Sequence, residues 1–309
     1  MHPRLLTGLS CLALLGLAAC KSNPSGTPVE NGKDPKPIAE LVERTNVPDP
    51  IGKVITDLDL QIRAWTRLKM TAATPEERNK ARELEKVITT KAHARRDELI
   101  EQLEGGPPAN RVVAASALGF THDPEALSPL VASLDDKNPE VVGNALLGLM
   151  ILGNKDAPLE RICDRLRNDT DPWVRTNAAQ CLSNLVQAGA RSSCVLASAR
   201  LGISDPEPGV RSHCALLLAT LVDTESLQAL IDLVHDAVPL VSSAAVHALV
   251  WIGRHDDKSK GRVARELVGL LDSARNPLRA QVQRGLVELS GVSYGNESKA
   301  WAEWATRVP

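Results

Sequence analysis

The stretch that decides the fold is Asp171-Pro172-Trp173-Val174-Arg175, because related phrases return along the chain. The other copies are Asn138-Pro139-Glu140-Val141-Val142, Glu207-Pro208-Gly209-Val210-Arg211, Val238-Pro239-Leu240-Val241-Ser242 and a slipped Asn276-Pro277-Leu278-Arg279. The apolar anchors are separated by 33, 36, 31 and 37 residues, and they are Val141, Val174, Val210, Val241 and Leu278. A period in this range indicates stacked helical units that bind along an extended surface.

Each anchor is expected to begin a helix with one apolar face. Small or apolar residues follow Val174 at offsets of four, eight and eleven, namely Ala178, Leu182 and Leu185. These offsets trace one face of a helix with 3.6 residues per turn. The proline ahead of the anchor suits the first helical turn. A second apolar series precedes each turn, so the repeating unit is helix, tight turn, helix.

The repeated residues resemble a known family. An aspartate stands six residues before an arginine in two units, as in Asp169 and Arg175, a proline lies between them, and an Ala-Ala-x-x-Leu run follows. This pattern resembles HEAT repeats, most nearly the short bacterial kind named after phycobilisome lyases. The resemblance covers about 105–290 and implies an all-α solenoid of five to six repeats, with the second helices on the concave side. Such folds host scaffolds and adaptors more often than catalysts.

The charged residues of the repeat are assigned to structure. Val142 and Ser242 replace the arginine in two units, so a ladder of Asp and Arg pairs along the stack is interrupted. The remaining pairs recur too regularly for a ligand site, and we expect them to brace adjacent repeats.

The amino terminus predicts a bacterial lipoprotein signal over 1–19. Arg4 gives a short positive region, and Leu5 to Leu17 is apolar but shorter than the roughly 20 residues of a membrane-spanning helix. Leu17-Ala18-Ala19-Cys20 resembles a bacterial lipobox. The resemblance implies cleavage before Cys20 and several acyl chains that anchor the protein stably. The alternative is an ordinary secretory signal with an incidental cysteine.

The residue after the lipidated cysteine predicts the membrane. Because Lys21 stands in place of an aspartate, we expect the outer membrane, facing the periplasm, in an envelope with two membranes.

Further segments follow from composition. Residues 20–49 are rich in Pro, Gly, Ser and Lys, which predicts a disordered tether. Residues 50–104 read as a helical hairpin with arms at 51–73 and 75–104. The solenoid is expected at 105–290, and 291–309 is expected to form a cap in which Trp301 and Trp304 cover the last repeat. The alternative is that these tryptophans form a pocket for a ligand.

Four cysteines remain after the predicted cleavage and lipidation: Cys163, Cys181, Cys194 and Cys214. An oxidising periplasm permits disulfides. Cys181 and Cys194 lie at similar distances on either side of the turn at Gln187-Ala188-Gly189, so we expect this pair to be the one that geometry allows. The alternative is that all four are small buried residues of the core.

Charge and spacing argue against several functions. The formal net charge of −2 gives no electrostatic attraction for nucleic acid. His235-Asp236 and His255-Asp256-Asp257 lack the spacing of a metal site, so no metal or cofactor is expected beyond the lipid on Cys20. Gly291-Val292-Ser293-Tyr294-Gly295 matches a nucleophile elbow, but that motif requires a preceding strand. We therefore expect no enzyme, with a lyase as a remote alternative.

The repeat also predicts where a partner binds. If offsets 0, 4, 8 and 11 face the core, offsets 3, 6 and 10 face outward on the concave side. Trp251 is the strongest candidate, because a large aromatic on a polar stripe can anchor a partner, and Trp173 is the second. The alternative is that both cover neighbouring methylenes. The other candidates at these offsets are Asn177, Gln180, Asn184, His213, His247 and Arg284.

These expectations combine into a functional hypothesis. The chain is predicted to be a non-catalytic scaffold, anchored by lipid in a bacterial cell envelope, which binds an unknown protein or peptide on its concave face. The alternative is a structural or assembly lipoprotein that acts through the charged arm at 75–104.

Overall fold

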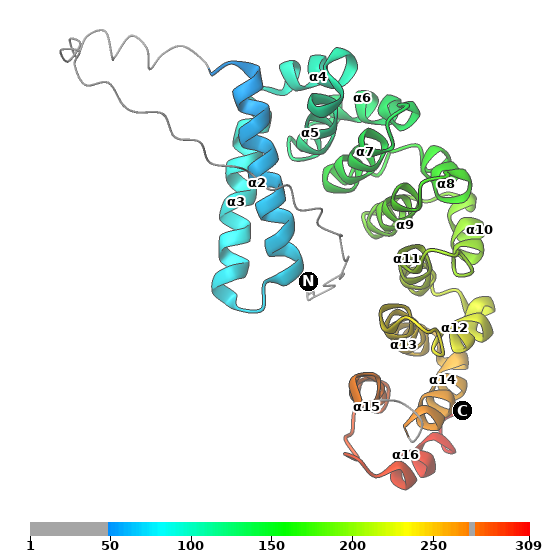
Figure 1. Ribbon diagram of the computed structural model, residues 1–309. Helices are drawn as coiled ribbons and strands as arrows, with labels where there is room; N and C mark the ends of the chain where they lie inside the picture. The colour runs from blue at the N-terminus through cyan, green and yellow to red at the C-terminus, as the bar shows by residue number, and fades with distance from the viewer. Residues whose placement is uncertain (1–48, 272–275) are drawn as a thin grey trace, which may run out of the picture.

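The computed structural model describes residues 49–271 and 276–309. The predicted signal, Cys20 and nearly all of the predicted tether lie outside these residues. The described chain contains fifteen α-helices and three short 3-10 turns, with no strand in that part. Within the same residues, no helix is both long and apolar enough to cross a membrane. The all-α repeat solenoid that the sequence predicts is confirmed (Figure 1).

The helices form two rows that follow one arc (Figure 1). The outer row contains α4 (Arg96–Gly105), α6 (Leu127–Ala132), α8 (Leu159–Asn168), α10 (Ser193–Gly202), α12 (Leu227–Leu233) and α14 (Asp257–Leu270). The inner row contains α5 (Pro108–Gly119), α7 (Pro139–Leu152), α9 (Pro172–Gln187), α11 (Pro208–Thr220), α13 (Pro239–His255) and α15 (Asn276–Ser290). Each inner helix packs on its neighbours, and this row lines the concave side (Figure 1).

The predicted core stripe is present on the inner helices. On α9, Val174, Ala178, Leu182 and Leu185 are fully buried. The helix begins where expected, because the Asp171 side chain accepts hydrogen bonds from the backbone N–H groups of its first turn, ahead of a proline that needs no acceptor. The offset of eleven is less uniform, because Leu152 and Leu221 are only partly buried near the ends of α7 and α11.

Ion pairs tie successive repeats together, as predicted. The Nε and Nη2 atoms of Arg175 donate to the two carboxylate oxygens of Asp205, both at 2.8 Å. Arg211 binds Asp236 in the same way at 2.8 and 3.0 Å, and Arg111 binds Asp136 at 2.9 and 3.2 Å. We name these three contacts the arginine junctions. Each joins the turn ahead of one inner helix to the turn of the next repeat.

The arginine junctions also fix the turns themselves. Nη1 of Arg175 donates to the carbonyl oxygen of Asp169 at 3.1 Å, and Asp205 accepts the backbone N–H of Glu207 at 2.8 Å. Burial raises the pKa of Asp136, but the hydrogen bonds from Arg111 and from the N–H of Asn138 outweigh it and hold that pKa below its usual value. Hydrogen bonds to the charged form of the carboxylate therefore exceed the cost of burying it.

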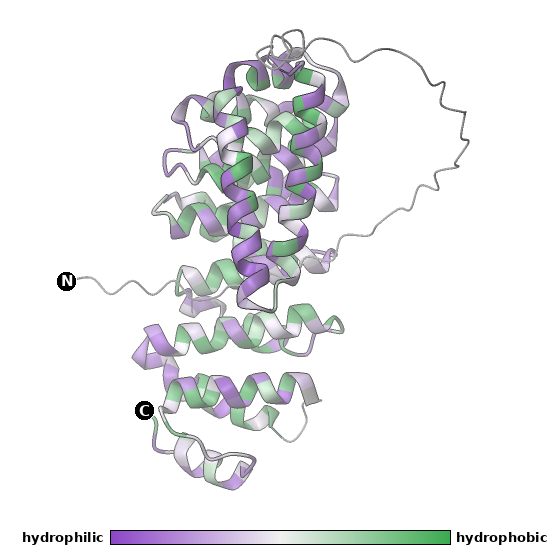
Figure 2. Cartoon of the chain, turned by 90° about the vertical axis from the view of Figure 1, so that its left-hand side faces the viewer, coloured by the Kyte–Doolittle hydropathy of each residue, from purple (hydrophilic) through white to green (hydrophobic). Residues whose placement is uncertain are grey.

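A helical hairpin precedes the repeats. It consists of α2 (Ile51–Thr71) and α3 (Pro75–Ala94), and Thr74 and Glu77 form a reciprocal capping box at the start of α3. The hairpin stands on the concave side in front of the first repeats (Figures 1 and 2). Trp65 of α2 meets Phe120 edge to face, with ring centroids 4.9 Å apart.

The second arm of the hairpin is shorter than the predicted 75–104. The helix breaks at Arg95, whose φ and ψ are −124° and 23°, and α4 begins at Arg96. The break turns Leu99 and Leu103 onto α5, where both are buried. The residues around 95–98 are charged and show no apolar periodicity, so the sequence does not reveal where one helix ends and the next begins. The first helix pair of the solenoid is therefore α4 and α5.

The carboxyl end closes the stack. In α16 (Ser298–Ala305), Trp301 is fully buried and its Nε1 donates to the carbonyl oxygen of Gly295 at 3.1 Å. Tyr294 and Trp304 meet Trp301 edge to face, with centroids 4.9 and 5.8 Å apart. This arrangement is the lid that the sequence predicts for Trp301 and Trp304.

The predicted disulfide between Cys181 and Cys194 is wrong. Cys194 is bonded to Cys163, with the two Cα atoms 6.3 Å apart, and Cys181 and Cys214 are free and buried. Cys181 is fully buried on α9, so its side chain points into the core between the helices and does not reach Cys194. Cys163 on α8 and Cys194 on α10 meet because the outer helices of consecutive repeats lie side by side.

Candidate partner-binding groove

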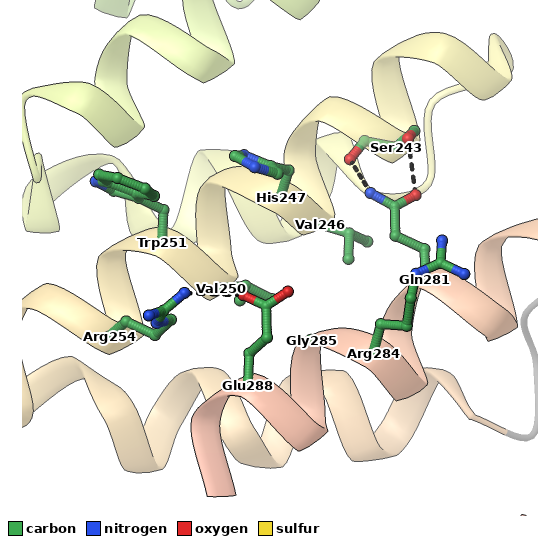
Figure 3. Close-up of a pocket in the computed structure, with 10 residues that line it drawn as sticks. All are labelled: Ser243, Val246, His247, Val250, Trp251, Arg254, Gln281, Arg284, Gly285 and Glu288. Atoms are coloured by element: carbon green, nitrogen blue, oxygen red, sulfur yellow. Dashed lines mark hydrogen bonds and ion pairs between the residues drawn. The ribbon is translucent and has the colours of Figure 1, made fainter. Parts of the chain in front are cut away.

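A groove lies on the concave side between α13 and α15 (Figure 3). Its cavity volume is about 280 Å³. The lining residues come from the exposed and interfacial faces of the two inner helices: Ser243, Val246, His247, Val250, Trp251, Arg254, Gln281, Arg284, Gly285 and Glu288. Three predicted partner-binding residues, His247, Trp251 and Arg284, are thus brought to one site.

The floor of the groove is apolar. Val246, Val250 and Gly285 are buried beneath the longer side chains. A Cβ added to Gly285 would lie 2.4 Å from Cγ2 of Val250, so an alanine there would displace the Val250 side chain. The longer side chains of α13 and α15 line the groove around this contact.

Polar contacts join the two helices at both ends of the groove. Gln281 donates through Nε2 to the carbonyl oxygen of Ser243 at 2.8 Å, and its Oε1 accepts from the Ser243 hydroxyl at 2.7 Å. At the other end, Arg254 pairs with Glu288 at 3.0 Å (Figure 3). The walls are therefore held in place before any ligand arrives.

Trp251 is supported by two histidines on the same helix. His255 stacks on it with ring centroids 4.2 Å apart, and His247 lies 6.5 Å away on a nearly parallel plane. The spacing of four residues places the three rings along one face of α13. Trp251 is only partly buried, so a flat, restrained aromatic surface faces the concave side.

Charge in the groove is unbalanced on the α15 side. Arg284 is exposed and makes no ion pair with any residue in 49–271 or 276–309. Neighbouring atoms that exclude water lower the pKa of His247, and the charge of Glu288 opposes this shift. An apolar floor beside an unpaired guanidinium suits an apolar side chain with a carboxylate close to it.

The other predicted concave residues do not form a second site. Gln180 is partly buried and Asn184 is exposed on α9, away from the groove. Asn177 is partly buried, and its amide nitrogen is enclosed without an acceptor among the described residues. The outward orientation predicted for His213 is wrong, because this side chain is buried, and burial lowers its pKa to about 4. Because α9, α11 and α13 pack closely, they cover the residues that stand three positions after each anchor in this part of the stack.

Trp173 lies outside the groove and packs between repeats. Its indole ring is partly buried against Gly143 of α7, and a Cβ added there would lie 1.8 Å from the ring. This contact supports the alternative to partner binding, in which the Trp173 ring covers neighbouring apolar atoms.

Sequence reasoning missed the floor of the groove. Val246 and Val250 fall between the core stripe and the outer stripe, so neither pattern selects them. Gly285 carried a signal, because a glycine inside a helix costs about 1 kcal/mol relative to alanine and indicates a close contact.

The structure also places the possible metal site and the elbow-like sequence. In the described part of the chain, no group of three or more His, Cys, Asp or Glu side chains is placed to hold a metal ion. Ser293 of the elbow-like sequence is exposed in the turn after α15, so a helix precedes it instead of a strand.

The chain is similar to known repeat proteins. A family model described as HEAT repeats matches residues 96–183 and 197–287, together more than half of the chain. No curated protein matches. Similar solved structures include computationally designed armadillo repeat proteins for modular peptide recognition, with 20% identity over 62% of this chain and 98% of theirs and a TM-score of 0.46.

Two further structures are similar to the chain. A designed armadillo repeat protein in complex with the peptide (KR)4 has 19% identity over 62% of this chain and 98% of its own, with a TM-score of 0.46. The complex of CpcE and CpcF of phycocyanin lyase from Nostoc sp. PCC7120 has 18% identity over 68% of this chain and 93% of its own, with a TM-score of 0.42.

Proposed function

The chain belongs to the HEAT-repeat family, and from that premise we propose that it is a non-catalytic scaffold that binds a protein or peptide on its concave face. The observation that carries the proposal is the groove between α13 and α15. It combines an apolar floor, a restrained aromatic ring and the guanidinium of Arg284, which has no ion-pair partner among the described residues, on the concave side of the stack.

Binding in the groove follows from these parts. An apolar side chain of the partner lies on Val246 and Val250, and the indole face of Trp251 covers it from one side. A carboxylate on the partner pairs with Arg284. The contacts of Gln281 with Ser243 and of Arg254 with Glu288 already fix both walls, so little conformational entropy is lost on binding.

Selection from a displayed library of random peptides tests the proposal. Peptides that bind the wild-type protein are expected to contain apolar and acidic residues. Trp251→Ala should weaken them by about thirtyfold, as loss of an anchoring aromatic costs about 2 kcal/mol. Arg284→Gln should weaken only the acidic peptides, and Asn184→Ala, an exposed change on α9, serves as the control. If the selected apolar and acidic peptides bind Trp251→Ala as tightly as wild type, the proposal fails.

The proposal includes a lipid anchor at Cys20 in a bacterial cell envelope, at the outer membrane facing the periplasm. Its support is the sequence alone, through the Leu17-Ala18-Ala19-Cys20 tetrapeptide and Lys21. The measurement is labelling of the protein with a radioactive fatty acid in a bacterial host with two membranes. Wild type should carry the label in the outer-membrane fraction and Cys20→Ser should not. Equal labelling of the two proteins would place the lipid elsewhere.

A second candidate function uses the hairpin. Leu60 of α2 is 63% exposed and Val87 of α3 is 48% exposed, on helices whose other exposed side chains are mostly polar or charged. Such residues can bind a larger assembly, as expected of a structural lipoprotein. Replacing both by serine separates the two functions. A partner crosslinked in the native envelope that is lost with these serines, but kept by Trp251→Ala, favours the hairpin.

A further inference from the structure

The junction between α7 and α9 differs from the three arginine junctions. At the position that Arg175 and Arg211 occupy in their repeats, this repeat has Val142, which is buried. The aspartate that an arginine would bind is still present as Asp169, on the next turn. Its side chain is 12% exposed, close to the 13% of Asp205 and the 11% of Asp236.

The carboxylate of Asp169 is only partly used. One oxygen accepts the backbone N–H of Asp171 at 2.9 Å, as Asp205 and Asp236 do in their own turns. The other receives Nη1 of Arg165 at 3.3 Å, a long contact from the outer helix α8. Arg165 also reaches Asp135 at 3.1 Å, so its charge is shared. No described residue makes the forked contact that Arg175 makes with Asp205.

The second half of an arginine site is present as well. Nη1 of Arg175 binds the carbonyl oxygens of Asp169 and Thr170, and Nη1 of Arg211 binds those of Asp205 and Pro206. The equivalent carbonyls ahead of Val142 belong to Asp136 and Lys137. Within the described chain neither of them accepts a hydrogen bond.

A cavity of about 440 Å³ lies between these two sets of acceptors. Its lining is Asp136, Lys137, Pro139, Val142, Arg165, Asp169, Thr170, Asp171 and Pro172. Two of the carboxylates are engaged elsewhere, since Asp136 binds Arg111 and Asp171 accepts the N–H groups of Trp173 and Val174. Asp169 is therefore the acceptor that the cavity presents.

We propose that this cavity binds the guanidinium group of an arginine side chain on a partner peptide. The bound group takes the place that Arg175 and Arg211 take at their junctions, with two N–H groups on Asp169 and a third on the carbonyls of Asp136 and Lys137. Lysine is a poor substitute, because an ammonium cannot make the planar forked contact. The site lies on the turns between the two helix rows, apart from the groove at Trp251, and does not rest on the proposed function.

The test is titration of the full ¹⁵N-labelled chain with N-acetyl-arginine amide, followed by NMR. The reporter is the backbone amide of Asp171, which donates to Asp169. The amides of Glu207 and Val238 are matched controls, because they donate to aspartates that already hold an arginine. The Asp171 amide should shift saturably and the two controls should stay. The lysine analogue and the neutral citrulline analogue should each bind at least tenfold more weakly.

Two variants make the result specific. Asp169→Asn keeps an acceptor for the Asp171 amide but removes the charge, and it should weaken the arginine analogue at least tenfold. Val142→Arg supplies the guanidinium from the chain itself, so it should abolish the response and raise the melting temperature. Asp205→Asn, at an occupied junction, should lower the melting temperature and leave binding unchanged.

Several outcomes would overturn the site. Equal shifts at the Asp171, Glu207 and Val238 amides would show general pairing with carboxylates. Equal affinity for the citrulline analogue would show that charge plays no part. An unchanged response in Asp169→Asn would overturn the proposal whether or not Val142→Arg folds.

Discussion

The α5 and α7 junction and the α13 and α15 junction are built on one register, yet the first is closed and the second holds a groove. Gly148 and Gly285 both stand seven residues after their anchors, Val141 and Leu278. A Cβ on Gly148 would lie 2.3 Å from the carbonyl oxygen of Ala115, whereas one on Gly285 would meet the Val250 side chain at 2.4 Å. In the closed junction Gly119 also touches the backbone of Gly148.

The difference shows how one repeat register gives two kinds of helix contact. Glycine facing glycine lets the backbones of α5 and α7 touch. At the α13 and α15 junction the side chain of Val250 faces Gly285 instead, and longer residues on both helices line the groove.

The largest effect is expected from breaking the closed junction. Gly148→Ala should lower the free energy of unfolding by about 2 to 3 kcal/mol, because the methyl group meets the fixed carbonyl oxygen of Ala115. Denaturant unfolding measures this. Gly269→Ala is the matched control, since nothing lies within 4 Å of a Cβ there, and it should stabilise the helix by about 0.5 to 1 kcal/mol. Equal behaviour of the two variants would contradict the closed contact.

The next largest effect is expected when the pH is lowered, and it distinguishes the buried His213 from His247 of the groove. The folded chain holds the pKa of His213 at about 4, below the unfolded value of 6.5. The unfolded state therefore binds a proton first as the pH falls, and stability is lost between pH 6.5 and 4. The loss at pH 5 should be about 2 kcal/mol relative to neutral pH.

Denaturant unfolding as a function of pH measures this step. His213→Asn, which places the residue found at Asn177 of α9 in the same register, should remove the loss above pH 5. His247→Asn should leave most of it, because His247 is exposed. A pH profile that His213→Asn does not change would rule out this histidine as the cause.

A smaller effect is expected at the open junction. Gly285→Ala should cost about 1 kcal/mol, less than Gly148→Ala, because the Val250 methyl group it meets can rotate away while a backbone carbonyl cannot. Unfolding curves of both variants, recorded together, give the difference. If Gly285→Ala costs as much as Gly148→Ala, the α13 and α15 contact is as rigid as the closed one.

The smallest change in stability is expected for Trp251→Ala. Trp251 is partly exposed and stacks on histidines of its own helix, so its loss should change the free energy of unfolding by about 0.5 kcal/mol. Thermal unfolding checks this. A cost of several kcal/mol would make Trp251 a core residue and remove the reason to place a partner on it.

The sequence predicts the fold well because the same packing pattern recurs in each repeat. The phrase around Pro172 and Val174 fixes where helices begin and which face is buried, and each copy supports the others. The groove was only partly predictable. His247, Trp251 and Arg284 follow from the register, but the buried state of His213 depends on the distance between neighbouring helices, which one helix's pattern does not contain.

The disulfide shows the same limit. The spacing of Cys181 and Cys194 about their turn predicts that they lie at similar positions along two helices, but it does not predict which way each side chain points. The bond to Cys163 depends on the rotation of α8 and α10 about their axes, which is set by contacts between repeats.

The bond between Cys163 and Cys194 also has a mechanical consequence. A solenoid under tension lengthens mainly by parting adjacent repeats, since each repeat touches only its neighbours. This covalent link joins α8 directly to α10 on the convex side, so these two repeats move as one block. When the two ends are pulled apart, the repeats on either side of this block must then separate first. Reduction of the disulfide would let all the repeats separate to a similar extent.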